Sequence, residues 1–565
     1  MAIETKIEEI SSDSSIMTDS ATTIRDISVN PHVAELSAEA KDATQHEHSL
    51  SLLQALKLYP KAVGWSILLS TAVIMEGYDV VLLPSFYAMP EFNRKYGILE
   101  ADGSYTVPAS WKSGLSNGVL CGEIIGLFIN GIVSERYGYK KTMIASLMMM
   151  IGAIFIPFFS QNIETLLVGS IICGIPWGVF QTLTTAYASE VCPTQLRAYL
   201  CTYVNLCWVM GQFIASGILR AMLNRNDEWQ FRIPFALQWL WPAPILLGVI
   251  FAPESPWWLI RKGRIEDAKK SLLRLTTRVD ENFSVDDTVA MMSHTNELEK
   301  SVSSGTSYLD CFRGTDRRRT EIACMTWLVQ TLCGSTFMGY STYFYQQAGL
   351  PTVQSFNLSM AQYALGALGT MGAWWLMSCA GRRTIYLRGS CILCILLLII
   401  GFTSLAPESN MASRWAIGSM LLVFTFIYDL TVGPVCYALV AEVSSTRLRS
   451  KTIVLARNFY NVGGIVVNIL TTYQLTPKPT GWGWGAGSAF FWAGTCFLCI
   501  LWIFFRLPEP KDRTYAEMDV LFEKRISARK FRDTKLDIFA PAHDKTSNRE
   551  ESDDEKPVEN FVEKI

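Results

Sequence analysis

Long apolar runs alternate with short polar segments through most of the chain. Each run holds roughly 18–25 residues, the length that a helix needs to cross a bilayer. The runs predict spans over 62–86, 110–133, 142–160, 164–187, 199–221 and 234–253, then over 319–345, 357–379, 384–404, 414–438, 452–473 and 485–507. The pattern therefore predicts an all-α membrane protein with twelve transmembrane helices.

Polar segments divide the predicted chain into five parts. We expect a disordered cytosolic tail over 1–60, a six-helix bundle over 61–253, a cytosolic linker with amphipathic helices over 254–318, a second six-helix bundle over 319–507 and a cytosolic tail over 508–565. Residues Ile265 to Arg278 of the linker have amphipathic helical spacing.

The two predicted bundles resemble each other in sequence. Glu190 and Glu442 follow the fourth and tenth spans, and Arg197 and Arg449 stand seven residues after them. Matching halves in parallel orientation are typical of a transporter whose site lies between them. We therefore expect two pseudo-repeated bundles.

Basic residues set the predicted orientation. They concentrate in the linker and in the loops after the second, eighth and tenth spans, which the positive-inside rule places in the cytosol. Both termini are then cytosolic. We expect a multi-pass protein of the plasma membrane, with the vacuolar membrane as the alternative.

Composition agrees with a membrane protein. Hydrophobic residues make up 50% of the 565 residues and charged residues 18%, against about 25% in soluble proteins. The net charge of −2 argues against a nucleic-acid partner, and the chain shows no zinc spacing, phosphate loop or nucleophile–base pair. We expect no enzyme activity, no cofactor and no metal, and a monomer in a lipid bilayer.

Few charged residues lie deep inside the predicted spans. Four are acids, Glu76, Asp79, Glu123 and Asp429, and one is a base, Arg457. Charges are costly in hydrocarbon, so such residues usually face a cavity and act there. Four acids cannot all be ionised beside one base, which favours a proton-coupled carrier. Asp429 is left open between a functional and a structural role.

Uncharged polar residues also line up along several spans. Arg457, Asn461, Gly464 and Asn468 form one stripe of the eleventh helix. Amides and hydroxyls pair with sugar hydroxyls, and aromatic faces suit a sugar ring. The candidate sugar-binding residues are Asn205, Gln212, Gln330, Thr331, Thr336, Tyr340, Tyr437 and Asn461.

Several motifs in chain order resemble the sugar porter family of the major facilitator superfamily. They include Gly77-Tyr78-Asp79, the loop from Gly131 to Lys141, Pro253-Glu254-Ser255-Pro256, Gln330-Thr331-Leu332-Cys333-Gly334, Gly381-Arg382-Arg383 and Pro508-Glu509-Pro510. Met75 to Asp79, Cys173 to Gly178 and Ala456 to Asn461 are similar to the fungal maltose and general α-glucoside permease branch. Thr331 and Thr336 depart from the hexose carriers, which usually have glutamine and asparagine there.

The resemblance implies a major facilitator fold and symport of a proton with an α-glucoside such as maltose. Asp79, Glu76, Glu123 and Arg457 would then couple the proton. The alternatives are a hexose or other sugar carrier or facilitator, and a sugar sensor that does not transport. Sensors of this fold typically carry a very long C-terminal tail, so the short tail favours transport.

Charged residues at the cytosolic helix ends are candidates for a gate. Ion pairs there would form when the inner side closes, with ordinary topology-setting charge as the alternative. The candidates are Glu135, Arg136, Glu190, Arg197, Arg382, Glu442 and Arg449. Asn357-Leu358-Ser359 forms a glycosylation sequon in a predicted outer loop.

Overall fold

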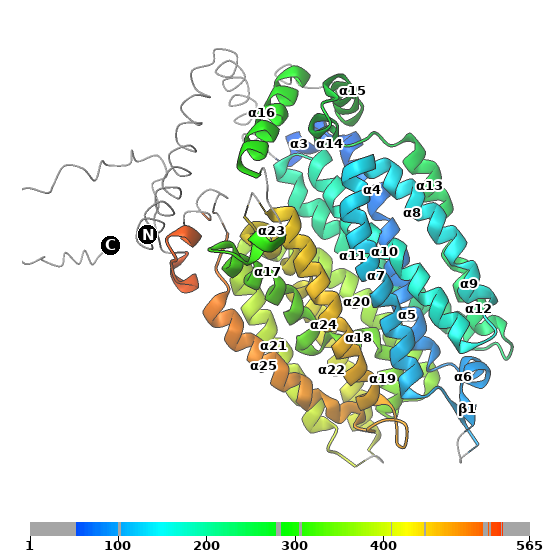
Figure 1. Cartoon of the computed structure of the whole chain (residues 1–565). Helices are drawn as coiled ribbons and strands as arrows, with labels where there is room; N and C mark the ends of the chain where they lie inside the picture. Colours follow the sequence, from blue (N-terminus) through cyan, green and yellow to red (C-terminus); the bar gives the residue numbers. More distant parts are fainter. Residues whose placement is uncertain are drawn as a thin grey trace, which may run out of the picture.

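The computed structural model describes residues 52–99, 103–277, 284–303, 308–407, 410–445, 448–511, 513, 518, 521–532 and 534. Residues 1–51 and 535–565, which hold most of the two predicted tails, lie outside the described residues. The described chain is almost entirely helical (Figure 1).

The first half builds six spans from helices α3 to α13. Their bounds are α3 Leu52–Leu58, α4 Pro60–Ser70, α5 Ala72–Phe86, α6 Pro90–Tyr96, α7 Ala109–Tyr137, α8 Tyr139–Ala153, α9 Phe155–Phe159, α10 Ile163–Val191, α11 Thr194–Met222, α12 Trp229–Leu237, the 3-10 turn η1 Gln238–Leu240 and α13 Pro242–Phe251. A two-stranded antiparallel ribbon, β1 Ile98–Leu99 and β2 Tyr105–Thr106, precedes α7.

The second half repeats this arrangement after a helical linker. The linker holds α14 Pro256–Arg261, α15 Ile265–Leu275, α16 Val285–Ser303 and η2 Tyr308–Phe312. The second half holds α17 Asp316–Gln330, the π-helical turn η3 Thr331–Ser335, α18 Thr336–Gly339, α19 Ser341–Gln347, α20 Thr352–Cys379, α21 Arg382–Thr403, α22 Met411–Leu430, α23 Val432–Val443, α24 Arg449–Leu475, η4 Gly485–Ser488, α25 Ala489–Arg506 and η5 Ala528–Lys530.

Each of the twelve predicted spans coincides with one of these helices or helix groups. Among the described residues, eleven helices are long and apolar enough to cross a membrane. The remaining one, α20, has 28 residues but is more polar, with Gln354, Asn357 and Gln362 in its first half. It packs along α22 and α11. The prediction of an all-α protein with twelve membrane helices in two bundles is confirmed.

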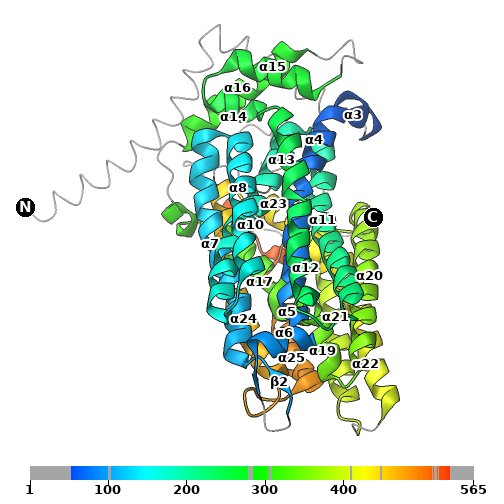
Figure 2. The ribbon, with the colours of Figure 1, turned by 90° about the vertical axis from the view of Figure 1, so that its right-hand side faces the viewer.

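The two halves lie side by side, with the linker helices α14, α15 and α16 gathered at one end (Figures 1 and 2). Two helix pairs join the halves along their length, α7 with α24 and α11 with α20. These are the second and eleventh spans and the fifth and eighth, so the pairing follows the internal repeat. Helices α6 and α19 lie at the opposite end, which we call the far end.

Two spans of the second half are broken near their middle. The seventh breaks in the π-helical turn η3, where Gly334 has φ +90°, a conformation that favours glycine. The tenth breaks at Thr431, just before Gly433-Pro434. Gln330 donates to the carbonyl oxygen of Gly433 (2.9 Å), so the two breaks are tied together.

The sequon prediction needs one correction. Asn357 does not lie in a loop, because α20 already begins at Thr352. Its amide oxygen accepts a hydrogen bond from Arg220 (2.7 Å) on α11, so the side chain is engaged between the halves. The polar first turns of α20 carry little hydropathy signal, and for that reason the apolar run alone places the helix start too late.

Candidate functional site

A buried polar cluster lies where the two bundles meet, and Gln181 of α10 is its centre. The Gln181 amide nitrogen donates to Glu76 of α5 and, at 3.4 Å, to Glu123 of α7. Its amide oxygen accepts from Arg457 Nε of α24 at 2.8 Å. Glu76 and Glu123 are only 2% and 3% exposed. One amide thus links two buried acids of the first half to the buried base of the second.

Aromatic rings surround the guanidinium of Arg457. It lies 4.7 Å from the ring centre of Trp327 and 4.5 Å from that of Tyr460. Tyr437 packs edge-on against Trp327, with ring centres 4.8 Å apart. Ring faces attract a cation, so this box of rings holds the guanidinium of Arg457 in place.

Close packing of α7 against α10 brings Glu123 to Gln181. A Cβ at Gly178 would clash with the carbonyl oxygen of Glu123, and a Cβ at Gly122 would clash with that of Ile171. Only glycine allows α7 and α10 to approach so closely. Gln181 stands one turn after Gly178, so the same crossing sets its amide beside the Glu123 carboxylate.

Asp79 forms its hydrogen bond outside the Gln181 cluster. It accepts a hydrogen bond from Gln238 in η1, at the middle of the sixth span. Glu76 and Asp79 are three residues apart on α5, yet they bind different amides on different helices. The structure therefore places Arg457 with Glu76 and Glu123, while Asp79 lies next to the sixth span.

The predicted sugar-binding residues fall into three groups. Asn461 is fully buried beside Glu123, and Tyr437 lies in the box around Arg457. Gln330 and Thr331 line the break of the seventh span, where Thr331 donates to the carbonyl oxygen of Leu328.

The third group lies along the interfaces between helices. Thr336 accepts from Thr471 (3.2 Å), and Tyr340 donates to Ser116 (2.9 Å). Asn205 donates to Thr370 of α20 (3.4 Å). Gln212 of α11 is buried and forms no side-chain hydrogen bond with the described residues.

Asp429 of α22 packs against two glycines of α20. A Cβ at Gly366 would lie 2.6 Å from its carboxylate, and one at Gly369 would lie 3.2 Å from its Cβ. Asp429 forms no hydrogen bond within the described part of the chain, and it does not join the Gln181 cluster.

Hydrogen bonds join the two halves at the far end. The ammonium of Lys112 on α7 donates to the Tyr343 hydroxyl on α19 (2.9 Å) and lies 4.4 Å from the centre of its ring. The Gln346 amide donates to the carbonyl oxygen of Ala88 (3.1 Å). With the Tyr340 bond to the second span, these contacts join the part of the seventh span beyond η3 to the first half.

At the linker end, the ion pairs that the described gate candidates form do not join one half to the other. Arg261 of α14 binds Glu190 at 2.6 Å, and the same carboxylate accepts from Tyr139 (2.9 Å) and from Ser255. In the second half, Arg382 lies 3.3 Å from Glu442. The first pair fastens the linker helix α14 to α10 of the first bundle, and the second joins α21 to α23 of the second bundle.

The other gate candidates make fewer defined contacts. Arg136 lies over the ring of Tyr137 (5.6 Å), and the backbone carbonyl of Glu135 accepts from Trp258 (2.9 Å). The side chains of Arg197 and Arg449 lie outside what the structure describes.

Two glutamates repeat at equivalent helix starts. Glu254 accepts from the backbone N–H of Tyr139 (3.0 Å) at the start of α8, and Glu509 accepts from the backbone N–H of Arg383 (3.3 Å) at the start of α21. A carboxylate at a helix N-terminus is stabilised by the free N–H groups and the helix dipole. Burial, opposed by backbone N–H bonds, raises the pKa of Glu254 above its ordinary value.

Comparison with known proteins identifies the family. A family profile described as "Sugar (and other) transporter" matches residues 65–522. The chain belongs to this sugar transporter family. It is 43% identical over 514 residues to maltose permease MAL31 of Saccharomyces cerevisiae, covering 90% of this chain and 83% of that protein. It is also 43% identical over 506 residues to a general alpha-glucoside permease of that yeast, covering 89% and 82%.

Solved structures identify the fold of this sugar transporter family member. The proton:xylose symporter XylE bound to 6-bromo-6-deoxy-D-glucose superposes with a TM-score of 0.67 at 18% identity, covering 82% of this chain and 100% of that one. Inward-open XylE from E. coli superposes with a TM-score of 0.62 at 19% identity, covering 81% and 99%. The chain has the major facilitator fold.

Sequence reasoning missed three residues that organise the site. Gln181 and Gln238 bind the buried acids, and Trp327 forms a wall of the box around Arg457. Gln181 lies one helical turn beyond Gly178, on the side of the helix where a small residue allows close packing. This spacing is the one sequence signal that could have drawn attention to it.

Proposed function

We propose that this protein imports an α-glucoside of the maltose type together with a proton, by alternating access between the two bundles. The single observation that carries the proposal is the Gln181 cluster, which joins Glu76 and Glu123 of one bundle to Arg457 of the other. The similarity to maltose and general alpha-glucoside permeases supports the choice of sugar.

The cluster suits proton coupling because its charges are coupled to one another. Two buried carboxylates share one amide, and one guanidinium balances a single negative charge. Adding a proton to Glu76 or Glu123 therefore weakens the electrostatic attraction between the acids and Arg457, which lies on the other bundle. Asp79, held by Gln238, supplies a further protonatable group on the same helix as Glu76.

The sugar would bind near this cluster, between the bundles. We assign it to the amides, hydroxyls and rings of Asn205, Gln212, Gln330, Thr331, Thr336, Tyr340, Tyr437 and Asn461. The gate at the linker end is assigned to Glu135, Arg136, Glu190, Arg197, Arg382, Glu442 and Arg449, whose ion pairs would form when this side closes and break when it opens.

We place the protein in the plasma membrane as a monomer, with the linker end and both termini in the cytosol. The basic residues of the linker end support this orientation. The membrane potential then drives uptake. One charge crossing about 100 mV contributes about 2.3 kcal/mol, and about 1.4 kcal/mol corresponds to tenfold accumulation.

Sugar uptake with pH recording in a transport-null yeast host tests the proposal. We expect maltose or another α-glucoside to alkalinise the medium as it enters, with glucose and sucrose as comparisons. We expect Arg457→Gln to remove this proton uptake. Arg388→Gln is the matched control, because Arg388 is exposed on α21. A correctly localised Arg457→Gln protein that still takes up a proton with each sugar would contradict the proposal.

A further inference from the structure

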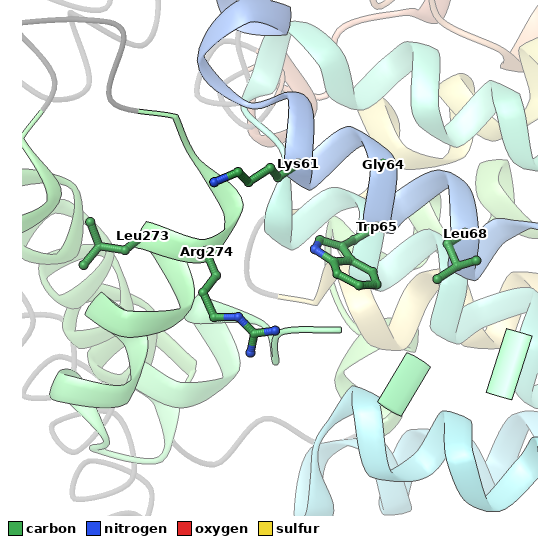
Figure 3. A pocket seen from close by; sticks show the side chains of 6 residues that line it. All are labelled: Lys61, Gly64, Trp65, Leu68, Leu273 and Arg274. Carbon is green, nitrogen blue, oxygen red and sulfur yellow. The ribbon is translucent and has the colours of Figure 1, made fainter. Parts of the chain in front are cut away.

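A cavity of about 680 Å³ opens between the start of the first span and the linker helix α15. Its walls come from α4 and α15, and it lies at the linker end, away from the Gln181 cluster. The lining residues are Lys61, Gly64, Trp65, Leu68, Leu273 and Arg274 (Figure 3).

The lining divides into a basic mouth and an apolar wall. Lys61, Gly64, Trp65 and Leu68 follow one face of α4, at spacings of three, four and seven residues. Lys61 and Trp65 extend from α4 toward the gap, and Arg274 extends toward it from α15 (Figure 3). The cavity therefore offers two cations beside an indole ring and a leucine.

The guanidinium of Arg274 is held in place by a neighbouring helix end. It donates to the carbonyl oxygen of Phe251, the last residue of α13, at 2.5 Å. Lys140 lies close enough for its charge to repel that of Arg274. Within the described part of the chain, no ion pair joins an acidic side chain to Lys61 or Arg274. The nearby Glu254 is occupied by backbone N–H groups.

Apolar residues beside the cavity face outward. Leu247 is 63% exposed and Phe251 is 67% exposed on α13, whose Gly248 packs against Leu68. In a membrane such a surface faces lipid chains. The cations therefore stand at the depth of the headgroups, and the apolar wall continues toward the bilayer.

We propose that this cavity binds an anionic phospholipid, with the phosphate between Lys61 and Arg274 and an acyl chain along Trp65 and Leu68. The proposal rests on the orientation proposed above, since anionic lipids are concentrated in the cytoplasmic leaflet. A free phosphate would satisfy the cations but would leave the apolar wall uncovered. A bound lipid bridges the first span to the linker.

Lipid binding to the purified full-length protein tests the site. Native mass spectrometry would count dioleoyl phosphatidylserine retained in competition with dioleoyl phosphatidylcholine, in the presence or absence of inorganic phosphate. We expect a clear preference for phosphatidylserine that phosphate does not abolish. Lys61→Gln with Arg274→Gln should weaken retention on the order of tenfold. Lys262→Gln with Lys270→Gln, which removes the same charge from exposed sites, should not.

A second variant separates a built site from general attraction to positive charge. A Cβ at Gly64 meets no atom within 4 Å, so Gly64→Leu fills the cavity and keeps both cations. We expect it to lose the lipid as the double variant does, while it still elutes as a folded protein. Equal retention by wild type and Gly64→Leu, or competition by phosphate alone, would overturn the proposal.

Discussion

The Nε of Arg457 donates to the amide oxygen of Gln181 at 2.8 Å, and this bond connects the eleventh span to the fourth. Gln181 carries no charge, yet it is the side chain through which the two buried acids of the first half are hydrogen-bonded to Arg457. The connection between the bundles at the candidate site thus depends on a neutral side chain.

Replacing Gln181 should uncouple the acids from the base. Gln181→Leu keeps the volume but removes three hydrogen bonds from a buried network, each worth about 1 kcal/mol or more. We expect the initial rate of acid-driven sugar uptake to fall on the order of tenfold or more. Initial rates of labelled maltose uptake measure this. Gln161→Leu, at an exposed glutamine, is the control and should keep the wild-type rate.

Asp79 should be needed for accumulation rather than for sugar exchange. Asp79→Asn can still pair with Gln238 but cannot gain or lose a proton at neutral pH. We expect labelled sugar still to enter vesicles preloaded with unlabelled sugar, which is counterflow. Accumulation of sugar driven by a pH gradient should be lost. Asp429→Asn serves as the comparison, since Asp429 lies outside the Gln181 cluster, and it should keep both activities. Loss of counterflow in Asp79→Asn would argue for a structural role of Asp79.

The break in the seventh span should require glycine at position 334. With φ +90°, an alanine there costs about 1–2 kcal/mol, and its Cβ would lie 3.1 Å from Leu397. We expect Gly334→Ala to reduce the maximal rate of uptake and to lower the melting temperature in detergent. Gly339→Ala is the matched control, because a Cβ there meets no atom within 4 Å. Similar effects of the two substitutions would contradict the prediction that the break requires glycine at position 334.

Glu254 should make stability depend on pH. Because burial raises its pKa, the folded protein holds this proton more tightly than the unfolded chain does. The stability that this provides is present below the ordinary glutamate pKa of about 4.3. It is lost as pH rises through the higher pKa of the folded state.

Glu254→Gln removes this dependence. The melting temperature of the wild type minus that of the variant should therefore decrease as pH rises from acidic to neutral. Thermal unfolding across this range measures it. Glu266→Gln, at a side chain that is 80% exposed, should run parallel to wild type at every pH. If the wild type instead gains on the variant with rising pH, ionised Glu254 stabilises the fold.

Much of the architecture was predictable from the sequence, because the length of an apolar run predicts a span. Charged residues are rare inside such runs, so they are easy to identify there. Arg457 and the three acids of the first half stand out for that reason. Their partners do not, since an amide such as Gln181 has little to separate it from other polar residues in a helix. Glu76 and Asp79 share a helix face, but residues three apart still point about 60° apart around the axis. Only the packing of neighbouring helices shows that each meets a different amide.

The gate candidates illustrate the same limit. Glu190 was predicted from the repeat, and Arg197 was its expected neighbour in sequence. The structure brings Arg261 to Glu190, from a linker helix 71 residues further along the chain. Such a contact depends on how the linker folds back onto the first bundle, which local sequence patterns do not encode.

The break at Gly334 divides the seventh span into two pieces that contact different parts of the protein. The first piece ends at Gln330, which is hydrogen-bonded to the tenth span. The second piece carries Tyr340 and Tyr343, which are hydrogen-bonded to the first half at the far end. The second piece is short, so a movement of α18 and α19 away from the first half breaks only a few hydrogen bonds. The anchored first piece can then stay in place. We expect the second piece to move on its own during transport, while the rest of each bundle stays in place. We therefore expect a state in each transport cycle in which the sugar is enclosed from both ends of the protein.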